Sequence, residues 1–509
     1  MTTDQQAAPA VRDADLSHFG YDSQLRRSLT LGDLLVYGLV FIVPIAPFAI
    51  FGIVFNASKG MVPLTYLIGV VAMVFTAVSY REMSEAFPVA GSVYAYASRG
   101  LHPSAGFLAG WAILLDYLLI PTLCYVVGAV AMHAVLPSIP QPLWVIGFLT
   151  FNTVVNMLGI ETTARASRLF LVMELIVLAV FVVLGAIAVS RGVNGSHWSL
   201  RPFFDPSVFR ASIIFNALSV AVLSFLGFDA ISTLAEETKG GARVVGQATM
   251  IALVLAAGLF ILQTYIAALL VGDQTEFVGD SAMNDAFYTV SALVGGSALK
   301  LMVAVAAALS AAIANALVAQ AATARLLFAM ARDGQLPRTL AHVHPVRRVP
   351  ERALLFVAAV SLVLGLFFVG QVGLLSSLVN FGALFSFLML HVSVVVFFLI
   401  KRRTWTLGAH VLSPVIGFAI IGFVLVNRRP REGRRPDLAG DRRRDSDRPE
   451  AGGTVHRASR DLGRASAAGH EVSVGRMQCF LNPAANPVMQ QRPLHRVTLD
   501  SQVGRVEAS

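Results

Sequence analysis

The chain has 509 residues, of which 56% are hydrophobic and 14% are charged, and its formal net charge is +9. Its mean hydropathy of +0.69 lies far above that of an ordinary soluble globular domain, so this class is excluded. A helix needs about 20 apolar residues to cross a hydrocarbon layer of roughly 30 Å, and runs of this kind recur in the chain. The composition therefore predicts a membrane protein.

The positive charge is concentrated near the end of the sequence. Residues 428–509 hold 16 arginines and 10 acidic residues, a net charge of +6, which leaves +3 for the other residues. This distribution argues against a nucleic-acid-binding protein, and we expect no nucleic-acid partner. Cys124 lies in an apolar run and Cys479 in the polar tail, which indicates neither a disulfide nor a metal site. We expect no cofactor and no metal.

The first 30 residues contain seven charged residues and no apolar stretch. We therefore expect residues 1–30 to form a cytoplasmic segment rather than a cleavable signal peptide, so that the first span itself directs insertion.

Eleven apolar runs follow, separated by polar loops. They are continuous and rich in Ala, Leu, Val and Gly, whereas β-barrel spans would be short and alternating, so we predict an all-α polytopic membrane protein. The expected spans are residues 31–55, 62–85, 105–135, 143–158, 169–190, 211–235, 248–271, 298–331, 353–369, 374–400 and 407–427.

Lysine and arginine residues in the loops between these spans are divided unequally between the two sides. With the N-terminus inside, and with those near the ends of the spans included, 15 of them fall on the cytoplasmic side and five on the opposite face. Cytoplasmic loops are enriched in these residues, so the sequence predicts a cytoplasmic N-terminus in a bacterial inner membrane.

Eleven spans would place the arginine-rich residues 428–509 outside, against the same bias. The sequence changes there to RRPREGRRPDLAGDRRRDSDRPE, a composition that cannot bury a core. We expect a disordered tail, and our hypothesis is that truncation or a frameshift has removed a twelfth span. A basic arm that binds anionic lipid is the functional alternative.

Two of the expected spans contain residues that interrupt a helix. The first reads GLVFIVPIAPFAIFG, with Pro44 and Pro47 in the middle of the membrane, and the sixth reads VLSFLGFDAISTLAEET, with Gly227 and Asp229 near its centre. Proline removes a backbone donor and clashes with the preceding turn, so we expect broken helices. Such backbone is tolerated in a membrane only where it lines protein or a water-filled cavity.

The two interruptions are five spans apart. Matching breaks in two halves of a chain indicate an inverted-repeat transporter with its substrate bound at the bilayer midplane, although ordinary kinks are the alternative. We therefore expect a transmembrane permease domain over 31–427, made of a first repeat (31–190), a second repeat (211–400) and an extra helix (407–427).

Several segments resemble the amino acid, polyamine and organocation permeases, and most of all their bacterial putrescine importer branch. The matching segments are FPVAGSVYAYASRGLHPSAGFLAGW (87–111), LLDYLLIP (114–121), SFLGFDAISTLAEET (224–238), RLLFAMARDGQLP (325–337) and NFGAL (380–384), spread over roughly the first 425 residues. This resemblance implies a LeuT-like fold of two inverted five-helix repeats plus two further helices. It also implies alternating access with proton- or gradient-coupled uptake.

The sequence departs from the family pattern at the first break and at the end. Relatives that carry amino acids usually have a Gly-Ser-Gly type turn where this chain has Val43, Pro44, Ile45, Ala46 and Pro47, and their twelfth span is missing here. Free N–H groups at an unwound helix end bind a carboxylate, and the two prolines remove two such donors. This favours a small cationic amine such as putrescine. An amino acid permease or exchanger for neutral or cationic amino acids is the alternative, because neighbouring N–H groups could still serve a carboxylate.

A cationic substrate calls for acidic side chains within the membrane, and these are costly enough to be functional by default. Asp229 is the first candidate, with an N-cap of the second half-helix as its structural alternative. Asp116 beside Tyr117 suits an ammonium ion, but it could equally anchor two helices. The predicted substrate-binding residues are Val43, Pro44, Ile45, Ala46, Pro47, Asp116, Tyr117, Phe225, Gly227, Phe228 and Asp229.

Three further acids are candidates for proton coupling or for a cytoplasmic gate. Glu174 lies deep in the fifth span, about where resembling proton-coupled permeases have Lys or Gln, so it is a candidate for proton coupling, or else a glutamate hydrogen-bonded to a neighbouring helix. Glu236 and Glu237 end the sixth span. They are candidates for a cytoplasmic gate, with a solvated helix end as the alternative.

Other classes of membrane protein are less consistent with the sequence. No HExxH, GxSxG or Cys/His array is present, so we predict that the chain is not an enzyme. A sensor would normally carry a soluble output domain, and a channel would show conductance rather than saturable flux. The expected partners are a small-molecule amine or amino acid, a coupling proton or other cation, and the lipid bilayer.

Overall fold

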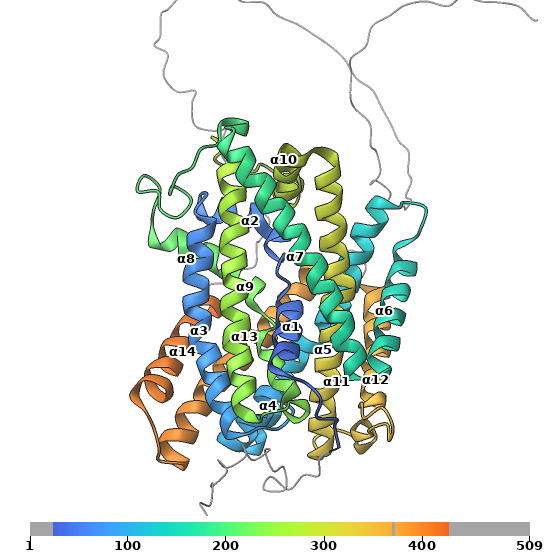
Figure 1. Ribbon diagram of the computed structural model, residues 1–509. Coiled ribbons are helices and arrows are strands. Elements are labelled where there is room, and N and C mark those ends of the chain that lie inside the picture. Colours follow the sequence, from blue (N-terminus) through green and yellow to red (C-terminus); the bar gives the residue numbers. More distant parts are fainter. Residues whose placement is uncertain (1–23, 369–371, 427–509) are drawn as a thin grey trace, which may run out of the picture. The chain divides into compact units, whose positions relative to one another are not determined.

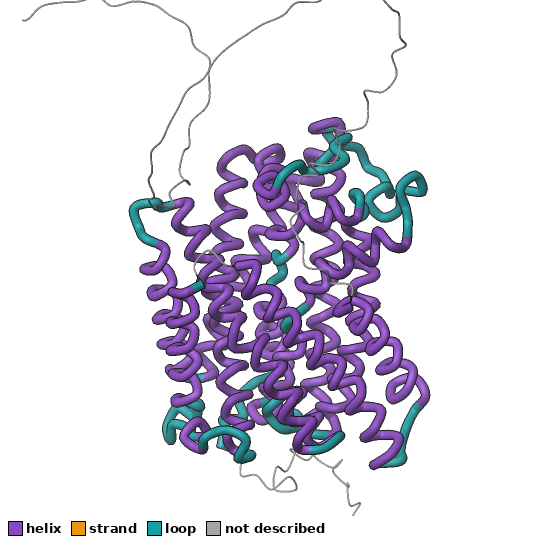
Figure 2. The backbone as a smooth tube through the Cα atoms, turned by 180° about the vertical axis from the view of Figure 1, so that it is seen from behind, coloured by secondary structure: helices purple, strands orange, loops and turns teal. Residues whose placement is uncertain are grey.

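Helices make up nearly all the secondary structure in the computed structural model of the chain, which describes residues 24–368 and 372–426 (Figures 1 and 2). Within these ranges the one extended pairing is an isolated parallel bridge between Leu29 and Thr238. The arginine-rich tail, for which we predicted disorder and a lost twelfth span, lies outside the described residues.

The first half of the described chain contains the two parts of the broken first span and the helices that follow it. These are α1 (Leu31–Ile42), α2 (Pro47–Ser58), α3 (Val62–Ala86), α4 (Ser92–Gly100), α5 (Pro103–Val135), α6 (Gln141–Met157), α7 (Ile160–Ser190) and the short η2 (Val193–Gly195).

The second half opens with the broken sixth span. Its helices are α8 (Ala211–Ala221), η3 (Val222–Phe225), η4 (Phe228–Glu237), α9 (Ala242–Leu270), α10 (Asp280–Leu309), η5 (Ser310–Asn315), α11 (Ala316–Arg332), η6 (Arg338–Ala341), α12 (Glu351–Phe367), α13 (Val372–Val395), η7 (Val396–Lys401), η8 (Gly408–Leu412) and α14 (Ser413–Val426).

The lengths and composition of these helices agree with the predicted class of polytopic, all-helical membrane protein. Among the described residues, eight helical stretches are long and apolar enough to cross a membrane, and the bent pair α1 and α2 makes a ninth. α6 and α12 match expected spans but have only 17 residues each.

Two elements differ from the expected spans. α4, nine residues rich in Ser, Tyr and Ala, was not expected, because it is too short and too polar to form an apolar run. α10 begins at Asp280, well before the expected start at residue 298, and it has non-helical backbone at Gly295 and Gly296. The two glycines thus separate an early helical segment from the expected span.

Both predicted interruptions are present. α1 and α2 are bent by 55° across a break of four residues, and η3 and η4 are separated at Leu226 and Gly227, whose φ is 114°. The α5, α9 and α3 helices surround these breaks, and α9 packs against α1, α3 and η4 (Figure 1).

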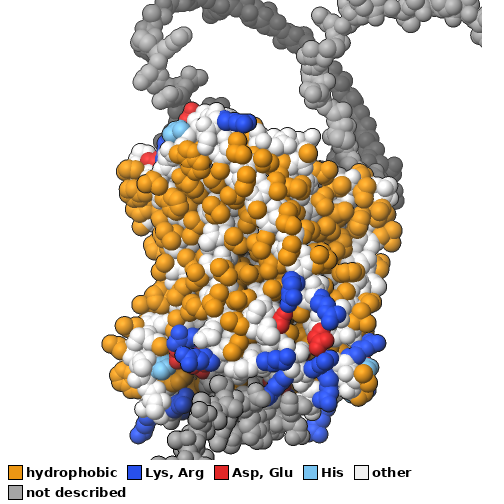
Figure 3. All heavy atoms as spheres, in the orientation of Figure 1, with side chains coloured by type: hydrophobic (Ala, Val, Ile, Leu, Met, Phe, Trp, Pro, Cys, Tyr) orange, Lys and Arg blue, Asp and Glu red, His pale blue; other side chains and the backbone are white. Residues whose placement is uncertain are grey.

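The surface has the distribution expected of a protein in lipid. Large apolar side chains of α7, such as Leu169, Ile176 and Val183, are more than half exposed, and hydrophobic side chains cover most of the face shown in Figure 3. Lys and Arg side chains gather at the lower end of that view, where α4 lies in Figure 1. Lipid can cover the apolar band, and water the charged end.

Candidate functional site

The break in the first span offers few free N–H groups. Pro44 and Pro47 carry no N–H, while the N–H of Val43 donates to Leu39 O (2.9 Å) and that of Ala46 to Val43 O (2.8 Å). Val43 has a φ of 61°, which is unusual for a β-branched residue. The Ile45 N–H therefore remains as the donor in this turn without a hydrogen bond to another described residue.

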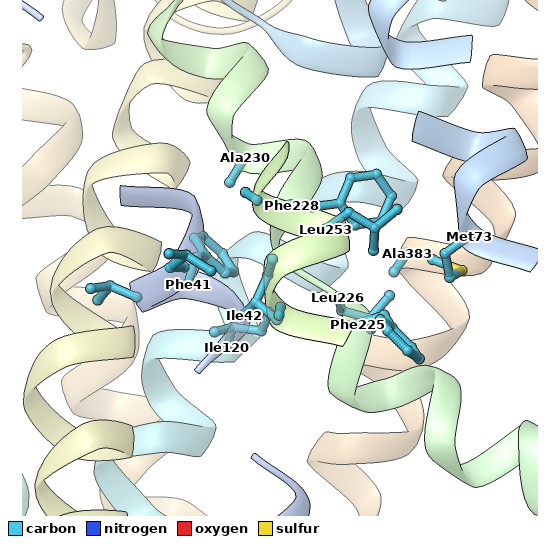
Figure 4. Packing of buried hydrophobic residues seen from close by; sticks show 14 of the residues in the cluster. Phe41, Ile42, Met73, Ile120, Phe225, Leu226, Phe228, Ala230, Leu253 and Ala383 are labelled. Carbon is cyan, nitrogen blue, oxygen red and sulfur yellow. The ribbon is translucent and has the colours of Figure 1, made fainter. Parts of the chain in front are cut away.

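The break in the sixth span lies directly against the break in the first. Gly227 contacts the Phe41 ring and backbone so closely that a methyl group at Gly227 would overlap the ring, and a methyl group at Gly38 would overlap Ile231 of η4. In Figure 4, Phe41 and Ile42 lie near Ile120 of α5, next to the sixth-span residues. Glycine at these two positions therefore lets the two broken spans touch.

We expect Gly227→Ala to destabilise the fold by about 2 kcal/mol or more, because alanine pays roughly 1–2 kcal/mol at a left-handed φ and also meets Phe41. Gly258→Ala is the matched control. Gly258 lies on α9 with nothing within 4 Å of an added methyl group, so this change should be neutral or slightly stabilising. Thermal unfolding of both purified variants in detergent measures the difference, and equal losses would contradict the close approach of the breaks.

Two acids and two tyrosines meet beside the Gly227 break. Asp229 is fully buried, and its carboxylate accepts hydrogen bonds from the Tyr117 hydroxyl (2.5 Å) and the Gly227 N–H (3.2 Å). Asp116, also buried, lies close enough to Asp229 to interact electrostatically, as does the Tyr80 hydroxyl. The structure thus brings together predicted residues from the third and sixth spans.

Several polar atoms of this acid–tyrosine cluster, which we define as Tyr80, Asp116, Tyr117 and Asp229, have no hydrogen-bond partner among the described residues. They are Asp116 Oδ1 and the Tyr80 hydroxyl, and the nearby Tyr96 hydroxyl shares this property. Buried polar groups are nearly always paired, so each of these needs a water or a bound solute. A solute that carries N–H donors could pair with the Asp116 carboxylate.

Aromatic rings surround the same cluster. The Tyr80 ring packs edge-on against Phe228 and Phe387, each with ring centroids 5.9 Å apart, and against Tyr96 at 6.1 Å. The Phe41 ring lies 6.0 Å from that of Tyr117. Aromatic faces attract cations. Carboxylates and ring faces together make this a suitable environment for an organic ammonium ion.

Two predicted site residues lie elsewhere. Phe225 precedes the break and packs against Tyr66 and Phe260, with centroids 5.9 and 5.4 Å away. Glu174 on α7 is fully buried next to Ser310 of η5, and neither its carboxylate oxygens nor the Ser310 hydroxyl has a hydrogen-bond partner among the described residues. Glu174 therefore has a polar neighbour on another helix, and both its proton-coupling role and the alternative of a glutamate hydrogen-bonded to a neighbouring helix stay predictions.

Glu236 and Glu237 end η4 in buried ion pairs, so the alternative of a solvated helix end is wrong. The Glu237 carboxylate accepts from Arg325 Nε (2.5 Å) and Nη2 (3.0 Å), and both side chains are at most 3% exposed. Glu236 accepts two hydrogen bonds from Arg332 (2.8 and 3.0 Å) and one from the Ala90 N–H (2.9 Å). These contacts join η4 to α11 and to the loop before α4.

The residues before α1 are attached to the same end of η4. The N–H groups of Ser28 and Leu29 both donate to Glu237 O at 3.0 Å, and the Lys239 N–H donates to Leu29 O at 2.8 Å. We call Ser28 and Leu29 the N-terminal strap. The strap and the ion pairs therefore attach the end of η4 to the residues before α1, to α11 and to the loop before α4.

A cavity of about 380 Å³ lies near the ends of α2 and α9 that point away from α4 (Figure 1). Its polar lining includes Lys59, Arg201, Asp205 and Asp273. Hydrogen bonds from Ser207 and Arg201 lower the pKa of Asp205 to about 2. Its charged groups largely neutralise one another, and it contains none of the predicted site residues.

Sequence reasoning missed most partners of the predicted residues. Tyr80 and Phe387 lie on spans that carry no break, and nothing in their sequence context singles them out. The sequence could have indicated the roles of Arg325 and Arg332, because an arginine within or at the end of an apolar span needs an acidic partner. Their spacing of seven residues also puts them on one face of a helix.

Comparison with known proteins identifies the class. The profile of the family described as "Amino acid permease" matches residues 32–427, and the chain belongs to this family. It is a multi-pass membrane transporter of amino acids or amines and not an enzyme.

Individual relatives have different substrates in their names. The chain is 32% identical over 410 residues to the low-affinity putrescine importer PlaP of Escherichia coli, covering 79% of this chain and 89% of that protein. It is 26% identical to the branched-chain amino acid permease BcaP of Bacillus subtilis, covering 74% and 82%. It is 27% identical to a methylthioribose transporter of the same species, covering 75% and 83%.

Proposed function

We propose that the chain imports a small cationic amine such as putrescine by alternating access, coupled to a proton. The observation that carries this proposal is that the site has few free N–H donors and several buried carboxylate acceptors. The first-span turn offers one unpaired N–H, that of Ile45. The sixth-span break, which contacts Phe41 of the first span, has two buried carboxylates beside it, and Asp116 Oδ1 has no hydrogen-bond partner among the described residues. A carboxylate substrate would find few donors, whereas an amine finds acceptors.

The substrate site that we propose consists of the first-span turn and the acid–tyrosine cluster. Val43, Pro44, Ile45, Ala46 and Pro47 form one wall, and Gly227, Phe228 and the cluster form the other. Phe225, just before the sixth-span break, packs against the Tyr66 ring and so holds the break in place. The similarity to a putrescine importer over 89% of that protein supports the same choice of substrate.

The proposed architecture has eleven spans, since α6 and α12 are added to the nine stretches described above, and inverted repeats over 31–190 and 211–400. We place the N-terminus in the cytoplasm of a bacterial inner membrane, because Lys and Arg side chains gather at the end where α4 lies (Figures 1 and 3). Glu236 accepts a hydrogen bond from Ala90, in the loop before α4. With this orientation, the ion pairs of Glu236 and Glu237 form a closed cytoplasmic gate.

Uptake by proteoliposomes tests the substrate. The purified protein is reconstituted, a proton gradient is imposed, and saturable uptake of labelled putrescine is compared with that of leucine and arginine, with protein-free liposomes as the control. We expect saturable putrescine uptake that excess spermidine or cadaverine inhibits more than leucine does. Saturable leucine uptake with no putrescine uptake would overturn the proposal in favour of an amino acid permease.

Glu174 is the proposed proton-coupling group, because it is a fully buried acid on the membrane-spanning helix α7, next to the Ser310 hydroxyl of η5. We expect Glu174→Gln to make initial putrescine uptake nearly independent of external pH between about pH 5 and 8, while exchange of internal for external putrescine continues. Ser310→Ala, which changes the neighbouring hydroxyl and leaves the carboxyl in place, is the control. An unchanged pH profile in Glu174→Gln removes Glu174 from coupling.

A further inference from the structure

The carbonyl groups at the first-span break are held by two side-chain amides from other helices. Asn315 of η5 donates from Nδ2 to Phe41 O at 2.7 Å. Gln263 of α9 donates from Nε2 to Pro44 O at 2.8 Å and to Leu259 O of its own helix at 2.9 Å. We call Asn315 and Gln263 the carboxamide clamp.

Each of these carbonyl groups has lost its helical donor. In a continuous helix Phe41 O would accept from the Ile45 N–H and Pro44 O from the Phe48 N–H. Here the Ile45 N–H has no hydrogen bond to a described residue, and the Phe48 N–H donates to Ile45 O instead. Buried carbonyl groups without donors are costly, so the amides replace the hydrogen bonds that the break removes.

The clamp also connects the break to the substrate site. Phe41, whose carbonyl Asn315 holds, packs against Tyr117 and Gly227, and Tyr117 in turn donates to Asp229. Gln263 is fully buried on α9, the helix that packs against α1 and η4 alike. A shift of the turn at Phe41 or Pro44 would therefore move the Phe41 and Tyr117 rings and, through Tyr117, the Asp229 carboxylate.

The amide assignments are chemically consistent. Asn315 Oδ1 accepts from the Cys124 thiol at 3.5 Å, which fixes the Nδ2 group toward Phe41 O. Gln263 faces two carbonyl oxygens, and only its N–H₂ group can donate to them. Gln263 Oε1 is buried without a hydrogen-bond partner among the described residues.

We propose that Asn315 and Gln263 are positioning residues that set the shape of the substrate site by holding Phe41 O and Pro44 O. This inference rests on the proposed function, in which the first-span turn lines the site. Neither side chain needs to touch the substrate. Both act through the turn, so their loss should affect substrate affinity more than the rate of the transport cycle.

Near-isosteric variants without a donor test the clamp. Gln263→Met and Asn315→Leu keep the volume and remove the amide. The matched control is Gln320→Met, because Gln320 is equally buried and hydrogen-bonded to Thr153 and Asn156, away from the break. We expect the clamp variants to raise the KM for putrescine about tenfold, with kcat within about threefold of wild type. Gln320→Met should leave KM within about twofold.

A second measurement does not depend on the substrate. Hydrogen–deuterium exchange of a peptide covering residues 39–52 in detergent micelles should be at least about tenfold faster in the clamp variants than in Gln320→Met. Equal exchange in all variants would overturn the clamp. Faster exchange with unchanged KM would overturn its positioning role.

The outcome also separates this inference from the proposed function. If the wild type takes up leucine and not putrescine, the amine assignment fails, and the KM comparison is then made with leucine. Faster exchange together with a raised leucine KM would still support the clamp. If neither the exchange rate nor the KM changes in the clamp variants, the clamp is refuted whatever the substrate is.

Discussion

Asp229→Asn is expected to lower kcat/KM for putrescine by about 100-fold. The Gly227 N–H and the Tyr117 hydroxyl donate to different oxygens of Asp229. Asparagine keeps one of these oxygens, which can still accept from the Gly227 N–H, and its NH₂ group can donate to the Tyr117 oxygen, so the variant removes the charge and keeps a similar shape. Loss of one partner from a buried charge interaction costs roughly 2–5 kcal/mol, and about 2.7 kcal/mol corresponds to 100-fold. Initial uptake into proteoliposomes at several putrescine concentrations measures the effect.

The control is Asp273→Asn, because Asp273 is an exposed acid in the loop after α9. It should leave kcat/KM within about twofold of wild type, as expected for a solvated surface charge. If Asp229→Asn transports putrescine as well as Asp273→Asn does, Asp229 only holds the Gly227 N–H at the start of η4 and the cation site lies elsewhere.

The largest expected effect on stability comes from the buried pair of Glu237 and Arg325. Replacing either partner alone, as in Glu237→Gln or Arg325→Leu, leaves a charge buried without compensation and should cost about 3–5 kcal/mol. The double variant Glu237→Leu with Arg325→Leu should be more stable than the sum of the single losses predicts. Unfolding of the purified variants in detergent, followed by tryptophan fluorescence, provides these values.

An exposed ion pair on the same protein serves as the comparison. Arg26 and Glu161 lie 3.1 Å apart with side chains 60% and 42% exposed, so Glu161→Gln should change the free energy of unfolding by less than about 1 kcal/mol. If Glu237→Gln and Glu161→Gln cost the same, the pair at the proposed cytoplasmic gate does not stabilise this conformation.

The two breaks could be predicted from the sequence because their causes are local. Pro44 and Pro47 remove donors wherever they stand in a helix, and Gly227 permits a φ of 114° without a steric penalty. The same reasoning identified Asp229, since a short acid that follows a break can cap the new helix end. The positions of the two breaks followed from these few residues, while the site residues beside them stay a prediction.

The partners of those residues could not be predicted, because they depend on which helices become neighbours. Arg325 is 88 residues from Glu237, and Asn315 is 274 residues from Phe41. No local sequence pattern shows that residues so far apart in the chain are in contact. Tyr80 and Phe387 were missed for the same reason, since an aromatic residue in an apolar span is as consistent with lipid contact as with a binding site.

The N-terminal strap has a consequence for observing the transport cycle. Its hydrogen bonds end on Glu237 O and Lys239 N, so the strap must move or detach whenever the lower end of η4 swings away from α11. A fluorophore on Gln24, which is exposed four residues before the strap, would therefore report inward opening in real time. Its signal should change with added amine in a sample that carries no radiolabel at all.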